Sequence, residues 1–174
     1  MESLTYLMRP PANPTGLPGR VGWEAIEATS GFKLPEDYKA FISTYGTGAV
    51  DGFLWVLNPF SENQHLNLIG QASRRLEAQR QFAKDTGVKA PHALHPDADG
   101  IFLWAVTDNG DVLYWSCRGA PSDWLIVVCD SRSSRWREFR ASTAEFLTSL
   151  ITREIVVDIF PDDFPSASPE FVVA

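Results

Sequence analysis

The sequence predicts an α+β fold: a single domain whose mainly antiparallel or mixed sheet has about four helices packed around it. Three patterns predict this class. Two stretches in the first third carry apolar residues at helical spacing, a polar-faced helix follows, and the second half alternates short apolar runs with turn residues. A length of 174 residues, with 44% hydrophobic and 21% charged residues, is sufficient for one compact core.

The first two helices are predicted between Trp23 and Gly46. Trp23 and Ile26 lie one helical turn apart, and Gly31 can end a helix in the left-handed conformation without a side-chain clash. Pro35 suits the first position of the next helix because its missing N–H would be unpaired there. Apolar stripes of this kind normally pack into a core, so we assign the aromatic residues to packing and not to a ligand. The stripe of the second helix consists of Tyr38, Phe41, Ile42 and Tyr45.

Two further elements are predicted in the middle of the chain. The apolar run Phe53–Leu57 indicates a strand, and spaced apolar residues indicate a helix over Gln71–Asp85 that Gly87 ends. This helix carries most of the basic side chains of its region.

The second half is predicted to be an antiparallel meander followed by a helix. The dipeptide Asn109-Gly110 is typical of a tight hairpin turn with two positive-φ residues. Ser142 and Glu145 have the spacing of a capping box at the start of the last helix. The predicted strands are Ile101–Val106, Val112–Trp115, Trp124–Cys129 and Trp136–Phe139.

The two ends of the chain are predicted to lie outside the core. Residues 1–20 contain four prolines and form an extended arm, residues 21–157 form the domain, and residues 158–174 form an acidic, proline-containing surface tail. The first residues lack a basic start with an apolar core, and no window approaches the roughly 18 apolar residues of a membrane span, so we expect a cytoplasmic protein without membrane contact. Cys117 and Cys129 are therefore expected to be free thiols.

An ordered set of residues runs through the first helical pair: W-x-x-I-E, a glycine, L-P-x-D-Y-K-x-F, and then Y-G before a glycine-led strand. This pattern resembles the opening of the SUKH superfamily, the Smi/Knr-like domain, and the later order of elements agrees with it over roughly 22–155. The resemblance implies an α+β domain and, in bacteria, very often an immunity protein that neutralises a toxin, commonly a nuclease. Eukaryotic relatives act in cell-wall regulation, so the fold alone does not determine the role. The matching positions are Trp23, Ile26, Glu27, Gly31, Leu34, Pro35, Asp37, Tyr38, Phe41, Tyr45 and Gly46.

Acidic residues are concentrated in the C-terminal half. Residues 91–174 contain 13 acidic and 6 basic side chains, whereas residues 61–90 contain 3 acidic and 5 basic ones. A negative surface repels nucleic-acid backbones and speeds association with a basic protein. We therefore expect a protein partner with a basic surface, such as a toxin, no direct contact with nucleic acid, and no cofactor. Moderate acidity that serves only solubility is the competing interpretation. The candidate partner-binding residues lie in predicted loops or turns: Asp97, Asp99, Asp108, Asp111 and Asp123.

Two other functions stay open. The same fold could dock a regulatory or scaffold partner instead of a toxin, and no sequence feature separates these roles. A small metal-dependent hydrolase would use His92, His95 and Asp97, since imidazole and carboxylate groups ligate divalent ions. Pro91 and Pro96 interrupt this segment, however, and the H-x-x-H spacing lacks a general base at a defined offset. We therefore predict a non-catalytic binding protein with no metal ligands. Its candidate aromatic anchors are Trp55, Trp104, Trp115, Trp124 and Trp136.

Overall fold

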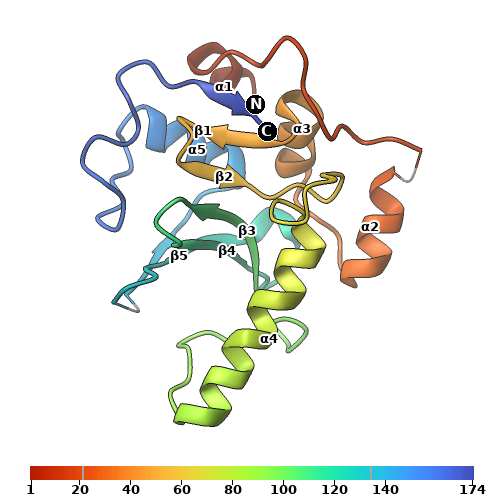
Figure 1. The fold of residues 1–174 in the computed structure, drawn as a ribbon, viewed down its shortest axis with the longest axis vertical. Coiled ribbons are helices and arrows are strands. Elements are labelled where there is room, and N and C mark those ends of the chain that lie inside the picture. Colours follow the sequence, from red (N-terminus) through yellow and green to blue (C-terminus); the bar gives the residue numbers. More distant parts are fainter. Residues whose placement is uncertain (21, 134) are drawn as a thin grey trace.

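The computed structural model describes residues 1–20, 22–133 and 135–174, and it has the predicted α+β fold (Figure 1). Five α-helices and a short 3₁₀ turn accompany seven strands in the described residues, so the expectation of about four helices is close. The helices are α1 (Glu2–Leu7), α2 (Gly22–Ser30), α3 (Glu36–Tyr45), α4 (Leu68–Thr86) and α5 (Thr143–Ile151), with the 3₁₀ turn η1 at Pro121–Asp123. The strands are β1 (Gly48–Val50), β2 (Leu54–Val56), β3 (Ile101–Thr107), β4 (Val112–Ser116), β5 (Leu125–Cys129), β6 (Trp136–Phe139) and β7 (Phe171–Val173).

The seven strands form one antiparallel sheet in the order β6-β5-β4-β3-β2-β1-β7. Strands β1 to β6 therefore follow one another across the sheet in chain order, as expected for a meander. The C-terminal strand β7 departs from this order because it pairs with β1. The strand pairs bring Ile101, Ser116 and Leu125 to the same end of the sheet, which places the loops next to these three residues close together.

Helices cover both faces of the sheet. Trp115 and Tyr114 are neighbours on β4 and point to opposite faces, as adjacent strand residues do. On the Trp115 face, Trp115 Nε1 donates to Thr143 Oγ1 of α5 at 3.0 Å, and the ring of Tyr38 from α3 lies 4.8 Å away. On the Tyr114 face, Gln79 of α4 donates to the Tyr114 hydroxyl at 2.9 Å. The core thus has two layers of helix with the sheet between them.

The residues predicted to cap or end helices do so in the structure. The capping box of α5 is present, with Ser142 Oγ accepting from the Glu145 N–H and the Glu145 carboxylate accepting from the Ser142 N–H. Helix α4 ends at Gly87, which has a left-handed φ of 73°. It begins three residues earlier than predicted because the Asn67 side chain accepts a hydrogen bond from the Gly70 N–H and caps the helix there.

The prediction of a two-residue hairpin turn at Asn109-Gly110 is wrong. Among residues 108–110, all of them described, only Gly110 has a positive φ, at 89°. The Thr107 N–H donates to Asp111 O at 3.0 Å and the Gly110 N–H donates to Thr107 O at 2.9 Å. This pattern belongs to a three-residue loop, in which only the glycine needs the left-handed conformation.

The expectation that both ends of the chain lie outside the core is also wrong. Leu4 and Met8 are fully buried, and α1 packs against α5. Near the C-terminus, Phe164 and Phe171 are buried and β7 extends the sheet. At the C-terminus, the Ala174 N–H donates to Thr47 O at 3.0 Å, next to β1. Apolar residues among the prolines therefore join the core, whereas the boundaries of the arm, domain and tail stay predictions.

Two smaller expectations concern the cysteines and the membrane. Cys117 and Cys129 are free and partly buried, and burial raises the pKa of each thiol to about 12. Both are therefore neutral thiols at physiological pH.

In the described part of the chain, no helix has the length and hydropathy that crossing a membrane requires.

Candidate protein-binding site

The fold separates the five candidate aspartates into two groups. Asp97 and Asp99 precede β3 and Asp123 precedes β5, so these three lie at one end of the sheet. Asp108 and Asp111 lie in the β3–β4 turn at the opposite end. The seven residues of β3 separate the two groups by about 20 Å. One compact contact area therefore holds three of the aspartates and not five.

Asp108 and Asp111 have contacts that hold the β3–β4 turn in place. Asp111 is 3% exposed, and its carboxylate accepts hydrogen bonds from Thr107 Oγ1 at 2.8 Å and from the Ser131 N–H at 3.0 Å. Asp108 is exposed, but its Oδ1 accepts from the indole N–H of Trp55 at 2.8 Å. The sequence could not reveal the inward orientation of Asp111, since its partner Ser131 lies twenty residues away.

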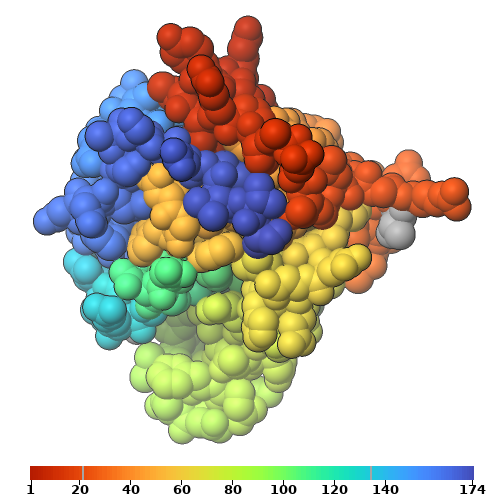
Figure 2. Space-filling model, turned by 45° about the horizontal axis from the view of Figure 1, so that its top comes forward, coloured from red at the N-terminus to blue at the C-terminus, as the bar shows by residue number. Residues whose placement is uncertain are grey.

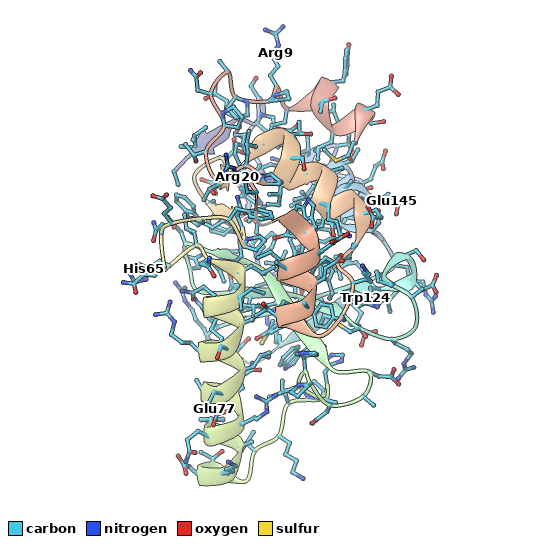
Figure 3. All side chains as sticks on the ribbon, turned by 90° about the vertical axis from the view of Figure 1, so that its right-hand side faces the viewer. Arg9, Arg20, His65, Glu77, Trp124 and Glu145 are labelled. Atoms are coloured by element: carbon cyan, nitrogen blue, oxygen red, sulfur yellow. The ribbon has the colours of Figure 1, made fainter. Side chains whose placement is uncertain are left out.

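Asp97 and Asp99 line a hollow of about 320 Å³, which we call the acidic groove. Its wall also includes Phe32 and Lys33 from the α2–α3 loop and Trp124, which directly precedes β5. Figure 3 labels Trp124 beside the lower end of α2. Asp123 is exposed and directly precedes Trp124, and its carboxylate lies next to Gly119, which lines the hollow. Two exposed carboxylates thus line a hollow with aromatic walls, and the carboxylate of Asp123 lies beside it.

The aromatic wall is packed and rigid. The ring of Phe32 makes edge contacts with Trp124 at 5.3 Å, with Phe102 at 4.9 Å and with His95 at 4.7 Å between centroids. Burial lowers the pKa of His95, which keeps its imidazole neutral at neutral pH. Lys33 lines the same groove as Asp97 and Asp99, but its Nζ lies 2.8 Å from Glu27 Oε2.

The loop that presents Asp97 and Asp99 is tightly folded. The His95 N–H donates to Ile101 O at 3.1 Å and the Gly100 N–H donates to Asp97 O at 3.0 Å. A Cβ at Gly100 would lie 2.5 Å from the backbone nitrogen of His95, so only glycine fits at this position. Asp99 forms a 3.8 Å ion pair with Arg118, but both side chains are largely exposed and the pair is weak. A rigid loop of this kind holds its charges in place before a partner arrives.

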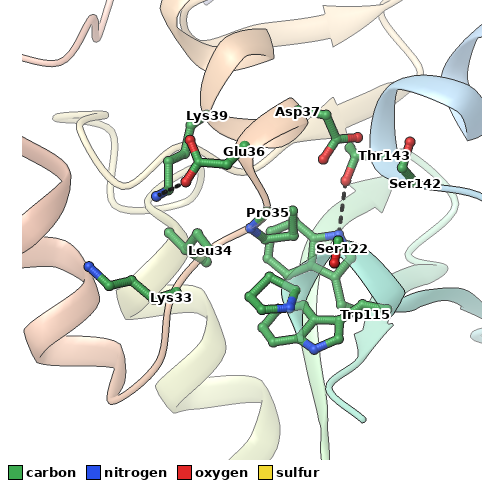
Figure 4. A pocket seen from close by; sticks show the side chains of 12 residues that line it. Lys33, Leu34, Pro35, Glu36, Asp37, Lys39, Trp115, Ser122, Ser142 and Thr143 are labelled. Carbon is green, nitrogen blue, oxygen red and sulfur yellow. Dashed lines mark hydrogen bonds and ion pairs between the residues drawn. The ribbon is translucent and has the colours of Figure 1, made fainter. Parts of the chain in front are cut away.

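A second hollow of about 520 Å³ continues from the first, with which it shares Lys33 and Trp124 (Figure 4). It reaches the first turns of α3 and α5. Asp37 joins these helices, since its Oδ2 accepts from the Ala144 N–H at 2.7 Å. Figure 4 shows the bond between Trp115 and Thr143 in its wall. The combined surface is long enough for a protein segment and is built from three separate parts of the chain.

The residues that resemble the SUKH pattern are packed beneath and beside this surface. Tyr38 and Tyr45 are fully buried, and their hydroxyls donate to Leu57 O and Met8 O. Glu27 is 6% exposed and accepts from the Leu34 N–H at 3.0 Å, which joins α2 to the α2–α3 loop. Gly31 and Gly46 end their helices with positive φ. The other matching side chains are buried or half-buried: Trp23, Ile26, Leu34, Pro35, Asp37 and Phe41.

The two histidines of the hydrolase alternative contact different residues in the structure. His92 lies 3.6 Å from Glu138 and contacts the ring of Trp136, whereas His95 packs against Phe32. Within the described ranges, no three His, Cys, Asp or Glu side chains are grouped so that they could hold a metal ion. Of the tryptophans named as anchors, Trp104 and Trp115 are at most 1% exposed and Trp124 is 6% exposed, so none of these three projects from the surface as an anchor.

Sequence comparison agrees with this arrangement of motif and fold. A family model described as SMI1-KNR4 cell-wall, of the SUKH group, matches residues 22–147. The chain belongs to the SUKH superfamily. The match begins at α2 and ends within α5, so it includes the acidic groove and most of the sheet of this SUKH protein. No curated protein and no solved structure gave a significant match.

Proposed function

We propose that this SUKH protein is a non-catalytic immunity protein that neutralises a basic bacterial toxin, such as a nuclease, in the cytoplasm. The observation that carries the proposal is the acidic groove, where Asp97 and Asp99 line a hollow with Phe32 and Trp124 in its wall. The exposed Asp123 lies beside it, next to Gly119. A basic toxin surface would meet the carboxylates, and an apolar or aromatic toxin side chain would fill the hollow. Binding would occlude the toxin's own site, which requires no chemistry from the immunity protein.

The charge distribution supports fast association. The C-terminal half has an excess of seven acidic side chains, and complementary charge raises association rates by steering the encounter. Asp108 and Asp111 lie about 20 Å from the groove, and Asp111 is buried, so we place both outside the central contact. The same negative field disfavours a nucleic-acid partner.

The decisive experiment is growth rescue. The product of the adjacent gene is expressed in a bacterial host with and without this protein, and we expect growth only when both are present. A triple variant with Asp97→Lys, Asp99→Lys and Asp123→Lys should fail to rescue. Its association rate should fall by about tenfold or more at low salt and by less at high salt.

A matched control carries the same change of charge at another surface. Asp162→Lys, Asp163→Lys and Glu170→Lys alter exposed side chains near the C-terminus and should still rescue growth. If both triple variants slow association equally, only net charge matters and the groove is not the contact. If neither alters the rate at any salt concentration, electrostatic steering is wrong.

The second candidate is a regulatory or scaffold module that uses the same groove for a partner other than a toxin. The description of the matching family refers to the cell wall, which is consistent with such a regulatory role. A pull-down from the native host separates the two roles, because a toxin partner must also arrest growth when it is expressed alone.

A further inference from the structure

The second half of α4 is poorly covered by the rest of the protein. All four buried residues of this helix lie in its first half, at positions 68–76. Figure 3 shows α4 running past Glu77 and beyond the other helices, and Figure 2 shows the same region as a projection with a recess above it. In this half Phe82 is 58% exposed, and in the following loop Val88 is 60% exposed. Exposed side chains of this size, side by side, are typical of a binding surface.

Phe82 and Val88 line a groove of about 820 Å³ between α4, the loop that follows it and the sheet. Its floor includes Leu94 and Trp136, both packed against the hydrophobic core. This volume is within the range of pockets that bind apolar side chains or small ligands. We call it the basic groove, because its charged lining includes Arg80, Lys84 and Lys89 and one acidic residue, Asp97.

The three cations have different roles. Arg80 donates to the backbone oxygens of Leu94 and His95, so it ties the loop to α4. Lys84 and Lys89 are exposed and form no ion pair with any described residue. In a chain of net charge −7, these two lysines are available to an incoming anionic group at the edge of an apolar hollow.

We propose that the basic groove binds an acidic peptide segment of a partner protein, with one large apolar side chain anchored between Phe82 and Trp136. Carboxylates that flank this anchor would pair with Lys84 and Lys89. Segments of this kind dock an apolar face into a groove and take their orientation from the charges at its rim. The site is distinct from the acidic groove, and Asp97 on the loop between them lines both.

The test measures binding of model peptides to the full chain by fluorescence polarisation. The first probe is a labelled peptide of Glu and Asp residues with Trp and Leu on one helical face. The second has Lys in place of each acid, and the third has Ala in place of Trp and Leu. We expect the first peptide to bind saturably and the other two to bind about tenfold or more weakly. High salt should weaken binding of the first peptide, because it screens the charges.

Protein variants then locate the site. Lys84→Glu with Lys89→Glu should weaken binding of the acidic peptide by about tenfold, and Phe82→Asp should do the same. Arg74→Glu is the matched control, because Arg74 is an exposed cation in the first half of α4 and does not line the groove. All four side chains are exposed, so we expect every variant to fold, and thermal melts verify this.

Four results would overturn the proposal: no saturable binding, equal binding of the basic peptide, an equal loss with Arg74→Glu, or no loss with the lysine variants. Sedimentation of the protein alone tests whether a second copy of the chain occupies the groove. A dimer that Phe82→Asp abolishes would mean that a second copy of the chain fills the groove. Asp97 lines both grooves, but the growth-rescue variants change Asp97, Asp99 and Asp123, whereas the peptide-binding variants change Phe82, Lys84 and Lys89. Either proposal can therefore fail without the other.

Discussion

Replacing Glu27 by glutamine tests whether the first helical pair is held by a buried carboxylate. Glu27 is 6% exposed, and its Oε2 lies 2.8 Å from Lys33 Nζ. Its Oε1 accepts from the Leu34 N–H at 3.0 Å and also pairs with Lys39, which is itself 12% exposed. Glutamine keeps the size of the side chain but removes the charge, so Lys33 loses its ionic partner and Lys39 keeps only its pair with Glu36.

The size of the effect follows from the pKa of Glu27. Burial alone would raise this pKa, but hydrogen bonds from Lys33, Lys39 and the Leu34 N–H outweigh burial and lower it from 4.5 to about 2. Since one pKa unit corresponds to about 1.4 kcal/mol, the ionised carboxylate contributes about 2 to 3 kcal/mol, with a discount for the exposed Lys33. In a chain of this length, that lowers the melting temperature by about 5 to 10 °C.

The pH dependence gives the sharper test. Because the pKa of Glu27 is lower in the folded protein than in the unfolded chain, its contribution is complete above about pH 4.5 and is lost as the pH falls toward 2. Urea unfolding of wild type and Glu27→Gln should therefore show a constant difference in free energy above about pH 5 that shrinks steadily below it. Glu24→Gln is the control, since Glu24 is exposed on the same helix and should change stability by a few tenths of a kcal/mol.

The reasoning is refuted if Glu27→Gln unfolds within about 0.5 kcal/mol of wild type at neutral pH, the range of ordinary surface substitutions. It is equally refuted if the difference stays constant down to about pH 3, because the lost interaction would then not be ionic.

Three further substitutions test the corrections to the predicted fold. Asp111→Ala leaves the buried Thr107 hydroxyl and a backbone N–H without an acceptor and should cost about 1 to 3 kcal/mol by urea unfolding. Leu4→Ala removes a fully buried side chain and should cost about 2 to 4 kcal/mol, against little change for Tyr6→Ala, where the ring is 88% exposed. Phe171→Ala should cost about 3 kcal/mol and increase hydrogen exchange in β1, because β7 is held against β1 by this buried ring.

Each of these has an outcome that would contradict it. If Asp111→Ala is neutral in stability but slows partner association, the carboxylate faces the partner and not the turn. If Leu4→Ala and Tyr6→Ala are alike, α1 is not part of the cooperative core. Unchanged exchange in β1 with Phe171→Ala would mean that β7 does not protect the edge of the sheet.

Much of the fold was predictable from local sequence. Helical stripes, the Ser142–Glu145 capping box and the glycine that ends α4 act within a few residues of chain, so their outcome does not depend on the rest of the protein. The strands β2 to β6 were predicted with small errors at their ends for the same reason. The SUKH pattern likewise consists of residues that are close in sequence, and the family match confirms it.

The candidate site was only partly predictable. Asp97, Asp99 and Asp123 were named as loop residues, but their convergence on Phe32 and Trp124 depends on the pairing of β3, β4 and β5. The basic groove had an indication in the cluster of Arg and Lys on the predicted helix. Nothing local indicated that this helix would project from the sheet and leave a hollow beneath it.

The sequence by itself therefore determined the family, the order of α2 to α5 and of β2 to β6, and the sign of the charge in each half of the chain. Only the tertiary structure decided which charges are exposed and which are buried. Asp111 and Asp123 were both predicted to lie in exposed loops or turns. Asp111 is buried and accepts a hydrogen bond from the Ser131 N–H, whereas Asp123 is exposed to solvent. The ends of the chain differ from their prediction for the same physical reason: burial is set by contacts between distant residues, as where Phe171 packs against α3.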